Sequence, residues 1–375
     1  MNARYLPTAS PDEIAAAAAE LGADGERLIG VLIADRNHPD LAEVVDALRR
    51  VGAPFFGGLL PGLIHEDQRL EEGALVVSLP AEHEPVLIRG LQTARFRVPE
   101  LQSIAAADAH SQTAIVLVDG LTANVSRLLS ELHGRVGNRV NYIGGGAGSM
   151  SFVQEPCVFT KEGVFQDAAV VAFVSQRSRI GVRHGWKNID GPVVATRTDG
   201  NVIQELNWKA AFDVYSDTIA PFIEAPLSRE NFAQVAGSFP FGIHREGHED
   251  VVRDPVAVGE DGELICVGEV PENAVLNILR GEPDALIEAA AQSAQDCLAG
   301  EPVNANSALV VDCVSRTLFL GERFEEELAA VREPLTAVHA KLPLWGMLSL
   351  GEISSYGEGS VEFLNKTIVT AVLHD

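Results

Sequence analysis

Glycine-rich segments follow apolar runs at three places in the chain, and main chain of this kind can line a ligand site. The segments are FFGGLLPGLI with Gly57 and Gly62, YIGGGAGSM with Gly144, Gly145 and Gly146, and WGMLSLGEI with Gly346 and Gly351. Glycine lets a ligand approach backbone N–H groups, and it equally permits a sharp bend with no ligand. We therefore predict glycine-rich turns that either converge on one pocket or only redirect the chain.

Two arginines and one glutamate could bind the charged ends of a small molecule. Arg253 and Arg316 each follow an apolar run, in VVR and VVDCVSR, so we expect both at strand ends. A guanidinium can hold a carboxylate through two parallel hydrogen bonds, and Glu352, just after the third glycine segment, could meet an ammonium group. The alternative is structural ion pairing with Asp312, Asp254 or Glu352.

Histidine and cysteine residues raise three other kinds of chemistry. His184 could coordinate a metal or haem iron, although a half-buried, hydrogen-bonded histidine is the more common situation. His244 and His248 would share a zinc ion if they lay on one helix, but Gly247 between them favours a loop. Cys313 as the nucleophile of a hydrolase would need a lowered pKa and access, and its apolar surroundings favour neither.

One pattern of elements occurs three times and must position these residues. An apolar run reaches an Asp, a helical stripe follows, a second apolar run reaches the glycines, and a further strand closes the unit. The helical stripes are 41–51, 125–136 and 324–335, and the closing strands are 74–79, 168–174 and 367–373. We predict a mixed α+β fold of the α/β type, in which repeated β-α-β-β units form mixed sheets flanked by helices.

The chain is long enough for two domains. At 375 residues it exceeds one ordinary core, and a polar step near 176–179 suggests domains at 1–178 and 179–375. No long linker separates them, so two closely packed lobes are expected. Other predicted elements include a helix after Ser10, a long strand over 85–98, an Ala-rich helix over 100–110 and hairpins at Asp199-Gly200 and Asp261-Gly262.

The composition of the chain indicates which classes of binding partner to expect. A net charge of −25 and a pI near 4.7 argue against nucleic acid and anionic membranes. No apolar run reaches the roughly 18 residues that a membrane-spanning helix needs. The four cysteines are far apart and form no C-x-x-C pair, which suits free thiols in a reducing compartment. We expect a cytoplasmic protein.

These motifs resemble the FIST family, with a FIST N part followed by a FIST C part over nearly the whole chain. In the first glycine segment Gly57, Gly62 and Ile64 match, whereas Gly58, Leu59, Leu60 and Leu63 replace polar residues of the family. YIGGGAG is similar to a second family turn, and GVRHGW resembles the opening of FIST C. VVRDP, DCVSRTLFLG and GMLSLGEI resemble its closing motifs, with matches at Arg253, Cys313, Arg316, Gly321, Gly346, Gly351 and Glu352.

The resemblance implies a non-enzymatic sensory module that binds small molecules such as amino acids. Signal output would pass through a separate protein such as a kinase or cyclase. No cofactor is expected under this hypothesis. Because some family members are haem proteins that sense nitric oxide, His184 is a candidate proximal ligand under an alternative hypothesis. A hydrolase or metalloenzyme is a third.

Overall fold

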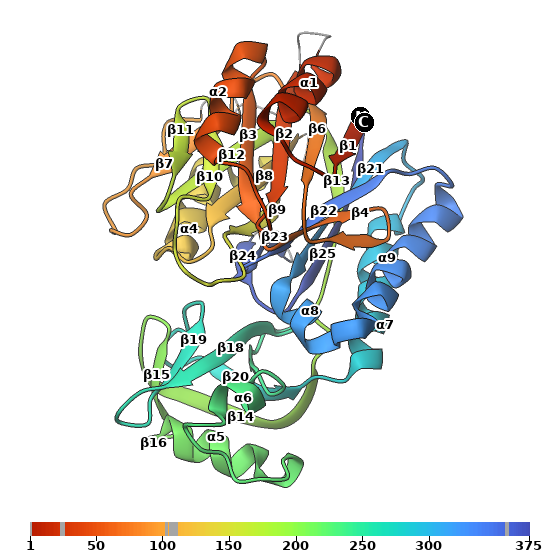
Figure 1. The fold of residues 1–375 in the computed structure, drawn as a ribbon. Helices are drawn as coiled ribbons and strands as arrows, with labels where there is room; N and C mark the ends of the chain where they lie inside the picture. The colour runs from red at the N-terminus through yellow and green to blue at the C-terminus, as the bar shows by residue number, and fades with distance from the viewer. Residues whose placement is uncertain (1, 23–26, 102–103, 105–111, 357–359) are drawn as a thin grey trace.

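The molecule consists of a large body and a smaller lobe (Figure 1). The computed structural model describes residues 2–22, 27–101, 104, 112–356 and 360–375. The body contains the described parts of 2–183 and 283–375, and the lobe contains 187–280. Two segments connect them, 184–186 and 281–282, which we call the first and second crossing. The lobe is therefore an insertion into the body.

The body contains three six-stranded sheets, and corresponding strands follow one another in the same order in each sheet. The first sheet is β1 (Asn2–Leu6), β6 (Ala74–Pro80), β2 (Arg27–Ala34), β3 (Phe55–Leu60), β10 (Val158–Thr160) and β11 (Gly163–Phe165). The second is β7 (Val86–Arg89), β12 (Ala168–Val174), β8 (Gln112–Asp119), β9 (Val140–Ala147), β23 (Glu352–Tyr356) and β24 (Ser360–Leu364). The third is β13 (Arg177–Arg183), β25 (Ile368–His374), β21 (Ala305–Cys313), β22 (Leu344–Ser349), β4 (Gly62–His65) and β5 (Gln68–Leu70).

Each sheet takes a hairpin from another unit. The β4–β5 hairpin pairs with β22, the β10–β11 hairpin with β3, and the β23–β24 hairpin with β9. The exchange is cyclic, and its strands meet near Leu59, Gly146 and Leu350. Leu350 N–H donates to Gly146 O at 2.9 Å and Gly148 N–H to Leu59 O at 2.8 Å. The three glycine segments therefore do meet, as segments of strand rather than as separate turns.

Most of the predicted glycine turns lie within strands. Gly57, Gly144 and Gly346 occupy one register position, opposite Val31, Val116 and Val310. A Cβ there would lie 2.3, 1.8 and 2.0 Å from the carbonyl oxygens of these valines. Gly145 and Gly146 also belong to β9, and Gly62 begins β4. These glycines permit close contact between main chains, whereas Gly351, with φ of 102°, does form a turn.

Helices cover the sheets and begin where the sequence indicates. Ser10 caps α1 (Pro11–Leu21) by accepting from Glu13 N–H, and Asp40 caps α2 (Leu41–Val51) by accepting from Ala42 N–H. The crossover helices between parallel strands are α2, α4 (Val125–Val136) and α9 (Phe324–Val338), as predicted. Other helices of the body within the described residues are α7 (Pro283–Leu298), α8 (Val314–Leu320), η1 (Gly137–Arg139) and η3 (Gly321–Arg323).

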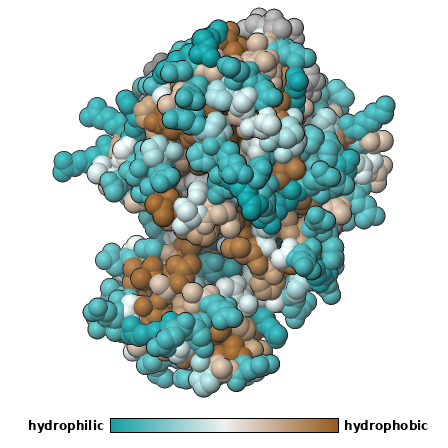
Figure 2. All heavy atoms as spheres, in the orientation of Figure 1, coloured by the Kyte–Doolittle hydropathy of each residue, from teal (hydrophilic) through white to brown (hydrophobic). Residues whose placement is uncertain are grey.

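The lobe is a strongly curved antiparallel sheet with short helices on one side. Its strands are β14 (Lys187–Asp199), β15 (Val202–Leu206), β16 (Lys209–Ala210), β17 (Phe241–Ile243), β18 (Val251–Val258), β19 (Leu264–Val267) and β20 (Val275–Arg280). Its helices are α5 (Ala211–Ile219), η2 (Ala220–Phe222) and α6 (Phe232–Ala236). Both predicted hairpins are present, with φ of 59° at Gly200 and 82° at Gly262. Figure 2 shows apolar residues gathered where lobe and body meet.

The mixed α+β fold is confirmed, and one long strand is corrected. Within 85–98 only β7 is paired, because Gly90, with φ of 81°, turns the chain and Phe96 and Val98 pack on the core as loop. The Ala-rich helix predicted over 100–110 lies mostly outside the described residues. The boundary predicted between 178 and 179 falls inside β13, an edge strand of the third sheet. None of the described helices is long and apolar enough to span a membrane.

Candidate functional site

A small cavity of about 80 Å³, the inner chamber, lies where the body meets the lobe. The body supplies Gly120 and Leu121 after β8, Phe152, Leu350, Gly351 and Asn365, together with Cys313, Val314 and Ser315 at the start of α8. The lobe supplies Asp254 of β18 and Val267 of β19. The chamber is thus lined by segments far apart in sequence, and its shape depends on how the lobe is placed.

Two side-chain oxygens at the inner chamber accept no hydrogen bond from any residue that the structure describes. Asn365 is 2% exposed and Asp254 is 8% exposed. Asp254 Oδ2 lies 3.0 Å from Lys366 Nζ, whereas Asp254 Oδ1 and Asn365 Oδ1 lack a partner among the described residues. A buried acceptor left without a donor costs about 1–3 kcal/mol. This chamber therefore favours a molecule that brings N–H or O–H donors.

A wider opening of about 470 Å³, the outer cleft, shares Gly120, Leu121 and Val267 with the inner chamber. It runs between the start of α4 and two lobe segments, the turn at 200–201 and residues 266–269 at the end of β19. Asn124 at the N-cap of α4 makes no side-chain capping bond, and the start of this helix, Asn124, Val125 and Ser126, lines the cleft. The two cavities together suit a molecule with an inner head and an outer tail.

Arg316 lies inside the body with no exposed surface. It stands in α8 rather than at a strand end, and its guanidinium donates to Glu327 through Nε and Nη2. Nη1 donates to the carbonyl oxygens of His184 and Lys366, and Nη2 to that of Leu286. All five N–H groups are used, so none is left for a ligand carboxylate in this structure.

Arg253 is also a structural cation where the lobe meets the body. It sits within β18, not at a strand end, and is 4% exposed. Its Nε donates to Glu269 O at 2.8 Å, and its Nη1 to Val252 O at 2.9 Å and Phe363 O at 3.1 Å. Burial lowers the pKa of Arg253 to about 10. The guanidinium thus holds Glu269 and Phe363, two residues that line the outer cleft.

Glu352 lies outside the lining of the inner chamber, whereas Cys313 belongs to that lining. Glu352 is fully buried, accepts from Ser349 Oγ at 2.6 Å and from Thr367 N–H at 3.2 Å, and does not line either cavity. Burial raises the pKa of Glu352 to about 8, so its carboxyl is mostly neutral at pH 7. Burial, together with the Glu352 charge, raises the pKa of the Cys313 thiol far above its usual range. These environments disfavour a nucleophilic thiolate.

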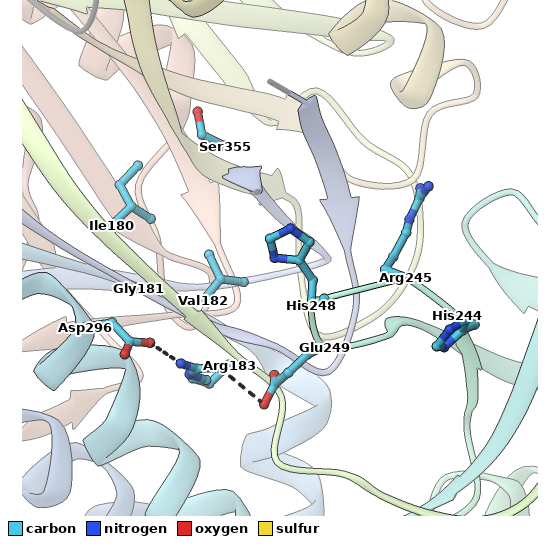
Figure 3. Close-up of a pocket in the computed structure, with 11 residues that line it drawn as sticks. Ile180, Gly181, Val182, Arg183, His244, Arg245, His248, Glu249, Asp296 and Ser355 are labelled. Carbon is cyan, nitrogen blue, oxygen red and sulfur yellow. Dashed lines mark ion pairs between the residues drawn. The ribbon is translucent and has the colours of Figure 1, made fainter. Parts of the chain in front are cut away.

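The predicted histidine loop lines a separate cavity of about 580 Å³, the histidine pocket (Figure 3). His244 and His248 lie on a loop between β17 and β18, as the glycine between them suggested. Arg183 from β13 reaches across to Asp296 of α7, with Nη2 2.7 Å from Oδ2, and lies 3.8 Å from Glu249. Within the part of the chain that the structure describes, no three His, Cys, Asp or Glu side chains form a metal-binding group.

His184 does not fit the role of a haem ligand. It lies in the first crossing, is 7% exposed, and lines none of the cavities above. Its Nδ1 accepts from Trp186 N–H at 2.9 Å, which places the proton of the neutral ring on Nε2, and Nε2 faces Glu249 at 3.8 Å. Burial lowers the pKa of His184 and keeps the ring neutral. A protonated Nε2 has no lone pair for iron.

Sequence reasoning missed Asp254, Asn365 and Lys366 as site residues. Asp254 was noted only as a possible partner for an arginine, and Asn365-Lys366 reads as an ordinary polar turn between apolar runs. The signal available was a lysine placed between Phe363-Leu364 and the apolar run of β25. Nothing in the sequence showed that the lobe would bury this turn.

Comparison with protein families identifies the chain. Residues 28–209 match the FIST N domain and residues 211–355 match the FIST C domain. No curated protein matches the chain significantly. FIST domains are sensory domains of signal-transduction proteins, to which small-ligand binding is ascribed. With both domain models matched in order over most of its length, this chain belongs to the FIST family.

Proposed function

We propose that this protein is a non-enzymatic sensory module that binds a small amino-acid-like ligand in the cleft between body and lobe. The observation that carries the proposal is the pair of unpartnered buried acceptors, Asp254 Oδ1 and Asn365 Oδ1, at the inner chamber. One oxygen belongs to the lobe and the other to the body. Because both residues line the same chamber, a ligand whose donor groups reach the two oxygens would hold the two parts together.

A primary ammonium group suits this position. It presents three N–H donors and a positive charge, which the Asp254 carboxylate attracts even though its other oxygen pairs with Lys366. The rim of the chamber is apolar, with Leu121, Phe152 and Leu350. Leu121 is 36% and Phe152 53% exposed, so both can contact an apolar side chain. These features favour an amino acid with an apolar side chain, such as L-leucine.

The carboxylate of such a ligand would point into the outer cleft. The uncapped start of α4 offers backbone N–H groups there, and the positive end of the helix dipole favours an anion. The Arg253 cation lies behind Glu269 and Phe363 on the lobe side of the same cleft. The ligand would then span both cavities, with Asp254 in place of Glu352 as the partner of its amine.

Isothermal titration calorimetry against the twenty amino acids, with L-leucine first, tests the proposal. We expect binding that weakens at least about tenfold in Asp254→Asn, because a hydrogen bond to a charged group contributes about 1.5–3 kcal/mol. Asp213→Asn is the matched control, since Asp213 is an exposed residue of α5. Absence of binding to the wild type, or equal affinity in Asp254→Asn, would refute the proposed site. A signalling protein that reads the occupied state is expected to be a separate partner.

A further inference from the structure

Arg316 joins three main-chain segments that determine where the lobe sits. His184 O belongs to the first crossing. Leu286 O, 3.0 Å from Nη2, lies in the first turn of α7, directly after the second crossing. Lys366 O, 3.1 Å from Nη1, belongs to the turn between β24 and β25. One guanidinium therefore holds both connections of the lobe and the turn that brings Asn365 to the inner chamber.

The anchor of this guanidinium is in the body. Glu327 of α9 accepts from Nε at 2.8 Å, and Asp312 Oδ1 of β21 lies 3.4 Å from the same atom. Arg316 directly follows Ser315, which lines the inner chamber. Helix α8 thus presents its start to the ligand site and the Arg316 side chain to the crossings.

The turn at Lys366 is itself constrained. Lys366 has φ of 54°, in the left-handed region that an L-residue adopts only at a cost, and it is 2% exposed. Its Nζ bonds lobe groups, Asp254 Oδ2 at 3.0 Å and Gly237 O at 3.0 Å. Its carbonyl also accepts from Trp186 Nε1, a residue of the first crossing, at 3.1 Å. Movement of the lobe must therefore displace this turn, and Asn365 with it.

We propose that Arg316 is a positioning residue that couples occupancy of the inner chamber to the orientation of the lobe. The inference rests on the proposed function. Asp254 Oδ1 on the lobe and Asn365 Oδ1 on the body are buried and have no donor among the described residues, so a ligand that donates to both ties the lobe to the body. Arg316 holds the two crossings and the Lys366 turn in fixed positions relative to one another. A ligand bound at the inner chamber therefore changes the orientation of the whole lobe relative to the body.

Distance measurements between spin labels on the full chain test this role. The four native cysteines are buried, so labels can be placed at Ser130→Cys on α4 and Lys209→Cys on the lobe, both exposed positions. Arg316→Lys keeps the charge beside Asp312 and Glu327 but offers three donors in place of five. Arg323→Lys is the matched control, because Arg323 is an exposed arginine next to α9 that pairs with Asp284 and Glu326.

In ligand-free protein we expect Arg316→Lys to broaden the distance distribution and Arg323→Lys to leave it unchanged. Adding L-leucine should narrow the wild-type distribution, and Arg316→Lys should bind it about tenfold more weakly although no chamber residue is altered. A wild-type distribution in Arg316→Lys overturns the proposal. If L-leucine and the other amino acids fail to bind the wild type, the proposed function fails, and the ligand-free distances still decide whether Arg316 positions the lobe.

A second variant covers the case in which Arg316→Lys does not fold. Lys366→Met removes the tie from the turn to Asp254 and leaves Arg316 with its carboxylates in place. It should broaden the ligand-free distribution in the same way. An unchanged distribution in this variant overturns the coupling through the Lys366 turn.

Discussion

Lys366 of the body and Asp254 of the lobe form an ion pair across the boundary between the two parts, with Nζ 3.0 Å from Oδ2. The side chains are 3% and 11% exposed. A buried ion pair adds little net stability, because desolvation offsets most of the attraction, but removing one partner leaves the other charge uncompensated. The pair therefore fixes the position of the lobe more than it strengthens the fold.

Asp254→Asn should destabilise the protein by about 3–5 kcal/mol, because it leaves the Lys366 ammonium buried without a counterion. Urea unfolding at pH 7 measures the change. The double variant Asp254→Asn/Lys366→Met should recover part of the loss, since it removes both charges. If the double variant is less stable than the sum of the two single changes, the ion pair is not the reason for the loss.

Gly346→Ala should destabilise by about 3 kcal/mol or more, because its Cβ would lie 2.0 Å from Val310 O and main chain cannot yield as a side chain can. Gly134→Ala is the control. Gly134 is exposed in α4 and nothing lies within 4 Å of its added Cβ, so we expect a gain of about 0.5–1 kcal/mol. Thermal unfolding of the two variants compares them. Equal effects would show that the strands are not in close contact at Gly346.

Stability should fall with rising pH because of Glu352. Burial raises its folded pKa to about 8, whereas the unfolded chain loses this proton near the ordinary value of 4.5. Between these values the folded protein binds one proton more than the unfolded chain, so the free energy of unfolding decreases by about 1.4 kcal/mol per pH unit from this group. Below the lower value and above the upper value the contribution is constant.

Glu352→Gln isolates this effect, because the amide resembles the protonated carboxyl and keeps a carbonyl oxygen for Ser349. Urea unfolding from pH 5.5 to 8.5 should show the wild type losing stability relative to the variant across this range. Parallel curves for the two proteins would show that Glu352 titrates normally and is not buried as described.

Phe152→Ala tests the apolar rim of the inner chamber. Phe152 is 53% exposed, so stability should change little, while affinity for L-leucine should fall about fivefold through lost apolar contact. Glycine, which lacks an apolar side chain, provides the matched ligand. Calorimetry that finds equal losses for glycine and L-leucine would place the effect at the ammonium group rather than the rim.

The cysteines should be unreactive in the folded protein. All four are buried, and burial raises the pKa of the Cys297 thiol to about 12. Ellman's reagent at pH 7.5 should modify four thiols per chain in urea and essentially none under native conditions. Rapid native labelling of Cys313, identified by peptide mapping, would revive the hydrolase hypothesis.

Local sequence patterns were enough to predict most of the helices and strands. The helices at 41–51 and 125–136 agree with α2 and α4 residue for residue, because each has a buried stripe of period 3.6 that ends near a glycine. The prediction of turns at the glycine segments was mostly wrong, for a physical reason. A glycine that permits a bend and a glycine that permits two main chains to touch look the same in sequence.

The sequence by itself determined the three strand–helix–strand units, their helix caps and the hairpins of the lobe, because hydrophobic period, capping and turn chemistry act over a few residues. Only the tertiary structure decided which sheet receives each exchanged hairpin and where the lobe rests. Those outcomes depend on contacts between residues far apart in the chain, such as Asp254 with Lys366 and Arg316 with His184. Burial then decided the roles of these residues. Arg316 donates to main-chain carbonyl oxygens, and Asp254 Oδ1 and Asn365 Oδ1 have no donor among the described residues.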